Sequence, residues 1–135
     1  MLTFDYGYEL DQLRDTDTET LVAYHRHQWN DDVYRRVGEQ DLTSHLDVDS
    51  FLRIGREVGL EPAGVTSQRD YLRGLGFAEE ADRWASRQTS PGRQWQARFD
   101  MGELVSLGGL GRLKVIAQTK GNISYRALNA CAKAL

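Results

Sequence analysis

The sequence predicts an α/β or α+β fold, on the strength of three observations. Short apolar or alternating segments near the N-terminus have the pattern of strands, whereas the apolar period becomes helical from Val48 onward. Two further short strand patterns follow among the helices. The 135 residues are 40% hydrophobic and 27% charged, which is ordinary for a globular domain, and they contain no repeat or linker-like run.

The first half of the chain predicts two strands separated by loops. An apolar run that ends in an acidic residue and a glycine, as in Leu2–Tyr8 (LTFDYGY), is typical of a buried parallel strand. Such a strand reaches the ligand-facing edge of an α/β sheet and needs neighbours on both sides. The polar stretch Glu9–Thr20 predicts a loop, Leu21–His27 alternates as a strand does, and Asn30–His45 is again loop-like.

The clearest helix begins at Val48. Asp47 or Asp49 can cap its start, and Gly59 can end it. The residues predicted to share the buried face of this helix are Val48, Phe51, Leu52, Gly55 and Val58.

Residues that favour the beginning or the end of a helix indicate the remaining elements. Ser67 can cap a helix that Gly76 stops, and Ser90-Pro91 combines a cap with a proline at the first helical position. The latter helix carries Trp95, Phe99 and Leu104. The predicted elements are, in order, a strand Ala63–Thr66, a helix from Ser67 to Gly76, a helix Ala78–Gln88, a helix that opens at Ser90, and a strand Arg112–Gln118.

Charge and cysteine content exclude several classes of protein. The net charge of -3, without a basic block, argues against a nucleic-acid surface and favours a cationic partner. Cys131 is the one cysteine, so an internal disulfide and a multi-cysteine metal site are excluded. No stretch approaches the roughly 20 apolar residues of a membrane span. We therefore expect a soluble, cytoplasmic protein that binds neither nucleic acid nor membrane.

The glycine-rich segment Gly108–Gly111 superficially resembles a dinucleotide-binding loop. A phosphate cradle needs a strand, a glycine turn and then a helix N-terminus. Here the order is helix, glycines and then strand. We interpret the segment as a helix stop and turn.

Three histidines offer a metal-site hypothesis. The spacing of His25 and His27 would place both imidazoles on one face of a strand, and His45 and several aspartates lie nearby in sequence. The alternative is that these histidines are surface or hydrogen-bonding groups. A metal-dependent hydrolase that uses all three therefore stays open as a further alternative.

Two acidic segments are the stronger candidates for chemistry. Asp5 and Tyr6 would sit at a strand end, where open α/β sheets bind ligands, although Tyr6 could equally be a packing residue in a turn. Asp41, His45 and Asp47 would project together, with Thr43, if their segment is extended. The alternative for Asp47 is that it merely caps the following helix.

These segments, in their order, resemble MidA-like S-adenosylmethionine (SAM) dependent methyltransferases. The family pattern is similar to LTFDYGY at Leu2–Tyr8, LVAYHRH at Leu21–His27, GEQDLTSHLDV at Gly38–Val48 and TSQRDYL at Thr66–Leu72. The closing strand resembles Leu113–Ala117. Glu19, Ser44 and Val48 stand where the family usually has Gly, Ala and Phe.

The resemblance implies a class I methyltransferase fold for the whole protein, of which residues 1–121 would be the C-terminal part and 122–135 an unassigned tail. The family's glycine-rich SAM loop and its acidic ribose-binding residue have no counterpart in the sequence. We therefore expect SAM as the cofactor by resemblance only, with no cofactor-binding residue in this chain, and little activity from the chain alone. The expected partners are a separate N-terminal half or a homo-oligomer; the alternative is a non-catalytic interaction domain.

A mitochondrial relative in this family methylates protein arginine and acts in respiratory complex I assembly, which implies an arginine side chain as methyl acceptor. Carboxylates would grip the planar guanidinium and orient one nitrogen. The resemblance makes Asp5, Asp41 and Asp47 the candidate catalytic residues. Tyr6, Tyr24 and His45 would complete the substrate pocket, and no residue is assigned to a metal.

Overall fold

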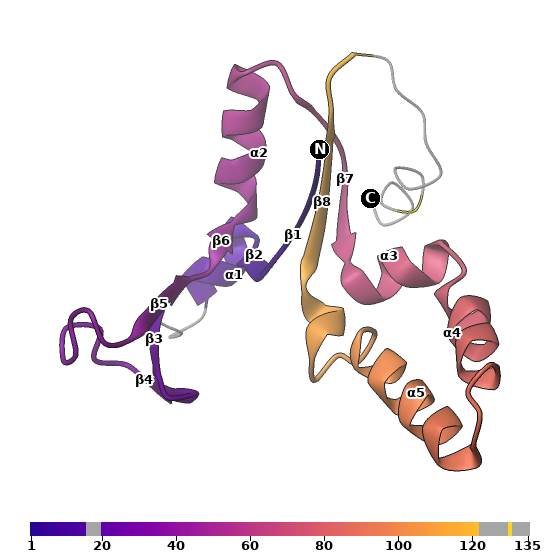
Figure 1. Cartoon of the computed structure of the whole chain (residues 1–135). Coiled ribbons are helices and arrows are strands. Elements are labelled where there is room, and N and C mark those ends of the chain that lie inside the picture. Colours follow the sequence, from indigo (N-terminus) through magenta and orange to yellow (C-terminus); the bar gives the residue numbers. More distant parts are fainter. Residues whose placement is uncertain (16–19, 122–129, 131–135) are drawn as a thin grey trace. The chain divides into compact units, whose positions relative to one another are not determined.

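The computed structural model describes residues 1–15, 20–121 and 130 (Figure 1). They fall into two compact units: unit 1 is Met1–Tyr6 with Leu52–Leu135, and unit 2 is Gly7–Phe51. No helix in the described ranges is both long and apolar enough to cross a membrane. The expected tail, 122–135, lies outside the described residues apart from Ala130.

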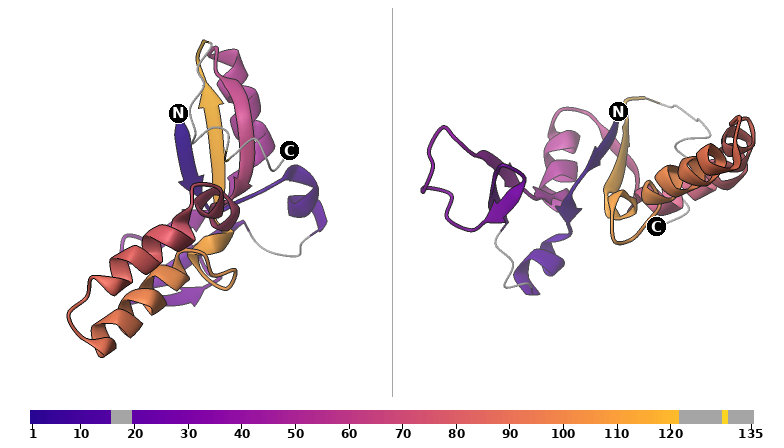
Figure 2. Two further views of the ribbon diagram at one scale, coloured as in Figure 1. Left: turned by 90° about the vertical axis from the view of Figure 1, so that its right-hand side faces the viewer. Right: turned by 60° about the horizontal axis from the view of Figure 1, so that its bottom comes forward.

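Unit 1 is built on a three-stranded sheet in the order β1-β8-β7. β8 (Lys114–Thr119) lies in the centre and runs antiparallel to both β1 (Leu2–Asp5) and β7 (Glu61–Ser67), as Figure 2 shows. All four residues from Val115 to Gln118 are buried, because β8 has a strand on each side and packing on each face.

The two faces of β8 are covered by different groups. Val115 and Ala117 pack with Tyr71 of α3 (Gln68–Gly74) and with Ala130. Ile116 and Gln118 point to the opposite face, since side chains alternate along a strand. The Gln118 amide lies against Gly55 of α2 (Val48–Glu57).

The helices of unit 1 begin and end largely where their caps predict. The Ser67 hydroxyl accepts a hydrogen bond from the Asp70 N–H at 3.0 Å, and the Ser90 hydroxyl accepts one from the Arg93 N–H at 3.4 Å. Gly59 and Gly76 have positive φ at helix ends. Besides α3 and the part of α2 from Leu52 onward, the helical elements between β7 and β8 are α4 (Phe77–Ser86), α5 (Pro91–Glu103), which pairs with α4, and the 3-10 turn η1 (Leu110–Arg112).

The glycine segment Gly108–Gly111 is a turn, as the sequence indicates. It follows α5 and precedes β8, with η1 between them. A Cβ on Gly111 would lie 2.5 Å from the Val105 carbonyl carbon, so this glycine permits a close approach of two backbone segments.

Unit 2 contains two small sheets and a helix. β2 (Gly7–Tyr8) pairs in parallel with β6 (Leu46–Asp47). The second sheet has the order β4-β3-β5, with all pairs antiparallel. Its strands are β3 (Leu21–His25), β4 (Gln28–Asn30) and β5 (Asp41–Ser44), and the helix is α1 (Leu10–Asp15).

Two expectations about loops are wrong. The stretch Glu9–Thr20 contains α1, whose Leu10 N–H donates to the Asp49 carboxylate at 2.8 Å. A cap that comes from a residue 39 positions away in the sequence leaves no local signal. The stretch Asn30–His45 contains β5, because Asp41–Ser44 pairs with β3.

The first strand also differs from its expectation. β1 is not a buried parallel strand: it is antiparallel to β8, ends at Asp5, and exposes Leu2 and Phe4. Within the described residues it has a strand partner on one side alone. Val58, expected on the buried face of α2, is 64% exposed because the helix has already ended at Glu57.

The contact between Gly55 and Gln118 makes a prediction about stability. A Cβ at position 55 would overlap the Gln118 amide, so this fully buried side chain would have to shift within the core. We expect Gly55→Ala to lower the free energy of unfolding by about 1–3 kcal/mol, despite the helix propensity of alanine. Urea unfolding followed by circular dichroism measures this change.

Gly102→Ala is the matched control, because Gly102 also lies in a helix but a Cβ there would meet nothing within 4 Å. We expect it to leave stability unchanged or to raise it by up to about 1 kcal/mol. Equal effects of the two substitutions would contradict the assigned packing of α2 on β8.

Candidate functional site

The segment Asp5-Tyr6-Gly7-Tyr8 divides between the two units. Asp5 and Tyr6 belong to unit 1, whereas Gly7 and Tyr8 belong to unit 2. Of the six residues predicted from the sequence, Tyr24, Asp41, His45 and Asp47 also lie in unit 2. The candidate residues therefore form two groups, each within one unit.

In unit 1, Asp5 and Tyr6 lie at the end of the edge strand β1. The Asp5 carboxylate accepts a hydrogen bond from the Tyr6 N–H at 2.7 Å and is exposed. Asp5 is the register partner of Lys114 on β8. The Arg112 guanidinium carbon lies 6.0 Å from the centroid of the Tyr6 ring, at the limit of a cation–π contact. Tyr6 is thus partly covered by a cation rather than packed into the core.

In unit 2, Tyr8 joins His45 and Asp47. The parallel pairing of β2 with β6 sets Tyr8 opposite Asp47. The ring centroids of Tyr8 and His45 are 5.0 Å apart at an interplanar angle of 56°. His45 Nδ1 is buried and has no hydrogen-bond partner among the described residues.

Gly7 permits this arrangement. A Cβ on Gly7 would lie 3.0 Å from the Leu46 carbonyl oxygen and 3.1 Å from a methyl carbon of Val48. Any larger residue would therefore push β2 away from β6. Tyr8 is a site residue that the sequence did not single out, although the segment that contains it was recognised as a candidate.

Asp47 caps α2. One of its carboxylate oxygens accepts a hydrogen bond from the Ser50 N–H at 3.1 Å. The alternative in which Asp47 caps the following helix is therefore correct.

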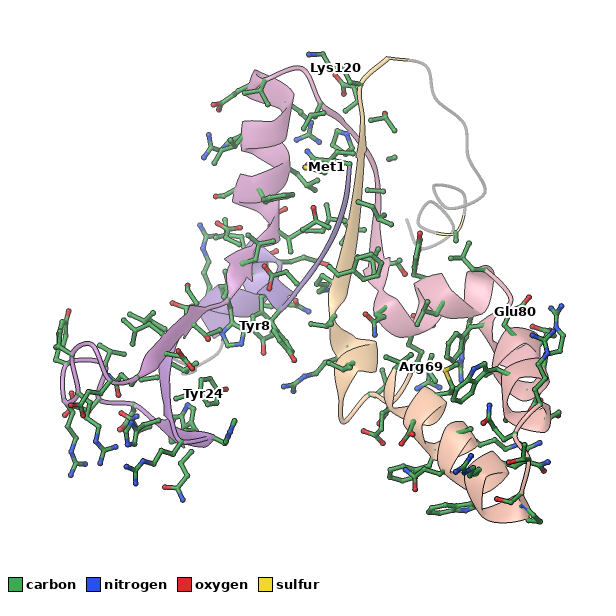
Figure 3. The ribbon with its side chains drawn as sticks, in the orientation of Figure 1. Met1, Tyr8, Tyr24, Arg69, Glu80 and Lys120 are labelled. Carbon is green, nitrogen blue, oxygen red and sulfur yellow. The ribbon has the colours of Figure 1, made fainter. Side chains whose placement is uncertain are left out.

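Tyr24 and Asp41 are neighbours on adjacent strands. The register pairs Tyr24 of β3 with Asp41 of β5 on one side and with Trp29 of β4 on the other. Residues directly opposite each other in a sheet project to the same face. Figure 3 shows Tyr24 among the side chains of the β3–β4 hairpin. Trp29 was missed because β4 has three residues, too few for an alternating pattern.

The three histidines do not form a metal site in the described part of the chain, where no group of three or more His, Cys, Asp or Glu side chains is arranged to hold a metal. His25 Nδ1 lies 2.7 Å from the Glu39 carbonyl oxygen. His27 lies in the β3–β4 turn, and His45 packs on Tyr8. The described residues therefore do not support the hypothesis of a metal-dependent hydrolase.

Unit 2 also has an open hollow with carboxylates at its wall. The hollow has a volume of about 430 Å³. The residues that line it are Thr20, Leu21, Asp31, Asp32, Val33 and Tyr34. One of the two carboxylates, that of Asp32, already accepts a hydrogen bond from the Tyr34 N–H at 3.1 Å.

Comparison with known proteins supports the resemblance at a coarse level. Residues 1–66 match a family described as "Putative S-adenosyl-L-methionine-dependent methyltransferase". This segment contains all six predicted site residues. No curated protein matches the sequence.

Two solved structures share the fold. A COG1565 superfamily protein from Burkholderia thailandensis superposes with a TM-score of 0.81 over 94% of this chain, at 24% identity. A COG1565 superfamily member from the same organism, bound to S-adenosyl-homocysteine, gives 0.79 over 93% at 24% identity. The chain covers 34% and 33% of these two proteins, about a third of their length. The expected α/β fold, with the architecture of part of these proteins, is confirmed.

The capping role of Asp47 can be separated from its charge. Asparagine is as good a helix cap as aspartate, whereas alanine cannot accept the Ser50 hydrogen bond. We expect Asp47→Ala to lower the free energy of unfolding by about 0.5–2 kcal/mol and Asp47→Asn to change it by only a few tenths. Urea unfolding of both variants makes the comparison, and an equal loss in both would mean that the charge, not the cap, stabilises the helix.

Proposed function

We propose that this chain is the acceptor-side portion of a MidA-like, SAM-dependent methyltransferase and that the methyl acceptor is an arginine side chain of a protein. The observation that carries the proposal is the family match over residues 1–66, which includes every predicted site residue. The fold shared with a protein bound to S-adenosyl-homocysteine gives further support.

The described residues do not fit SAM. The one glycine-rich segment among them, Gly108–Gly111, lies between a helix and a strand and is packed against Val105 and Ser106. It does not open a helix, so its N–H groups form no anion cradle. We propose that residues outside this sequence bind the cofactor, which would supply the methyl group.

The role left to this chain is to bind and orient the acceptor. Methyl transfer is an in-line displacement, for which the main requirement is a close and aligned nucleophile. A guanidinium can be held in one plane by carboxylates that accept from its N–H groups. In unit 2, Asp41 and Asp47 are the proposed carboxylates and Tyr24 and His45 the proposed pocket walls; in unit 1, Asp5 and Tyr6 take the corresponding roles.

A non-catalytic interaction domain is the second candidate, and the edge of β1 favours it. Within the described residues that edge has no strand partner, so its backbone groups are available to a further strand. A separate N-terminal half would use the same edge. SAM binding by the assembled pair would distinguish a divided enzyme from a purely structural association.

The first test is a calorimetric titration of the purified chain with SAM. We expect no binding, because the described residues lack a cradle for the cofactor. The Burkholderia thailandensis protein that was seen with S-adenosyl-homocysteine is the positive control. Micromolar binding to this chain alone would contradict the proposed division of roles.

The second test concerns Asp47 in the chain complemented by a SAM-binding segment. We expect Asp47→Asn to lower kcat on an arginine peptide by about 10- to 100-fold, because the nitrogen that attacks would no longer be aligned. Stability serves as the control, since asparagine preserves the cap. Unchanged turnover in this variant would remove Asp47 from the proposed site.

A further inference from the structure

Trp29, Tyr24 and Asp41 form a row across the β4-β3-β5 sheet. The Cα partners in the register are Tyr24 with Trp29 and Tyr24 with Asp41. The three side chains therefore project to one face, with neighbouring Cβ atoms about 4.5–5.5 Å apart. We refer to these three residues as the cross-strand row.

The cross-strand row faces solvent. Trp29 is 59% exposed and Tyr24 is 40% exposed, and Asp41 is also exposed. Val22, two residues before Tyr24 on the same face, is buried. One end of this face thus belongs to the packed interior, whereas the end with the two aromatic rings remains open.

The polar groups of the row are also available. Among the described residues, the Asp41 carboxylate, the Tyr24 hydroxyl and the Trp29 indole N–H have neither a hydrogen-bond partner nor an ion-pair partner. Tyr24 lies between Asp41 on one neighbouring strand and Trp29 on the other. A cation over this row is attracted by the charge of the carboxylate and by the negative faces of the aromatic rings.

The sheet holds the row in place from both sides. β3 and β4 are joined by the two residues Arg26 and His27, with φ of 51° and 63°, the arrangement of a tight hairpin turn that fixes the register. On the other side, the Gln40 amide donates to the Val33 carbonyl at 2.8 Å and accepts from Asn30 at 3.2 Å. The loop between β4 and β5 is thereby tied to β4.

We propose that the cross-strand row is a binding site for the guanidinium group of an arginine in the acceptor protein. This inference rests on the proposed function and adds Trp29 to the residues that recognise the acceptor. A guanidinium is planar and weakly hydrated, so it stacks on Trp and Tyr rings while its N–H groups donate to a carboxylate. An ammonium ion is more strongly hydrated and gains less from the two rings.

The test is a titration of the chain with the peptide Gly-Gly-Arg-Gly-Gly, followed by two-dimensional proton–nitrogen NMR. The three tryptophan indole N–H signals report separately, because Trp84 and Trp95 lie in unit 1. We expect the Trp29 signal to shift and saturate at millimolar peptide, while the Trp84 and Trp95 signals stay in place. The same peptide with citrulline, which has nearly the same shape without the charge, should produce no shift.

Substitutions identify the groups responsible. We expect Asp41→Asn and Trp29→Leu each to weaken binding of the arginine peptide at least 10-fold. Asp41 is exposed and its replacement by asparagine is conservative, so the Asp41→Asn variant remains informative if Trp29→Leu perturbs the hairpin. Asp31→Asn, which removes a carboxylate at the nearby hollow, is the matched control and should leave binding unchanged.

Each alternative outcome overturns the inference in a distinct way. No Trp29 shift at millimolar peptide would eliminate the site, even if the assembled enzyme methylates arginine. Equal binding of Gly-Gly-Lys-Gly-Gly, titrated in the same way, would refute the preference for a guanidinium. Loss of binding in Asp31→Asn but not in Asp41→Asn would place the cation in the hollow instead. Because no assay here uses SAM or turnover, failure of the proposed function leaves these results unchanged.

Discussion

Unit 1 depends on the burial of β8. This strand has a neighbour on each side, and its residues Val115 to Gln118 are shielded on both faces. β1 is held by its pairing with β8, and α3 contributes Tyr71 to the core around Val115 and Ala117. The last strand among the described residues therefore organises the first, so the sheet of this unit can form only after nearly all of the described chain is present. Gln118 lowers the stability of this core, since its buried side-chain amide has no hydrogen-bond partner among the described residues.

Elements with local signals could be predicted from the sequence, whereas elements with distant partners could not. Ser67 and Ser90 satisfy N–H groups three residues away, so the signal lies within one helical turn. At the start of α1, the Glu9 N–H has a local partner in the Gln12 side chain, but the Leu10 N–H donates to the Asp49 carboxylate, which becomes a partner only after the chain has folded back. The predicted parallel direction of β1 was wrong for a related reason. Apolar composition predicts that a segment is a strand, but it does not determine whether the neighbouring strand is parallel or antiparallel.

The candidate site was predictable in part for the same reason. Tyr24 and Asp41 were both selected from motifs. Their adjacency follows from the register of β3 with β5, and the sequence does not determine this register because β4 and a loop separate the two strands. Trp29 became visible only once the Arg26–His27 turn had placed β4 beside β3. Asp47 shows that one carboxylate can match both a family motif and a helix cap, so the motif alone does not separate a binding role from a structural one.

The edge of β1 has a consequence for the behaviour of the chain in solution. Its sequence, Leu-Thr-Phe-Asp, contains neither proline nor lysine, and its pairing with β8 has no bulge, so its short length and the Asp5 carboxylate are the features left to discourage strand addition. Leu2 and Phe4 are exposed beside these backbone groups. Two copies that meet at this edge would extend the sheet from one molecule into the next, so self-association of the isolated chain should increase with concentration.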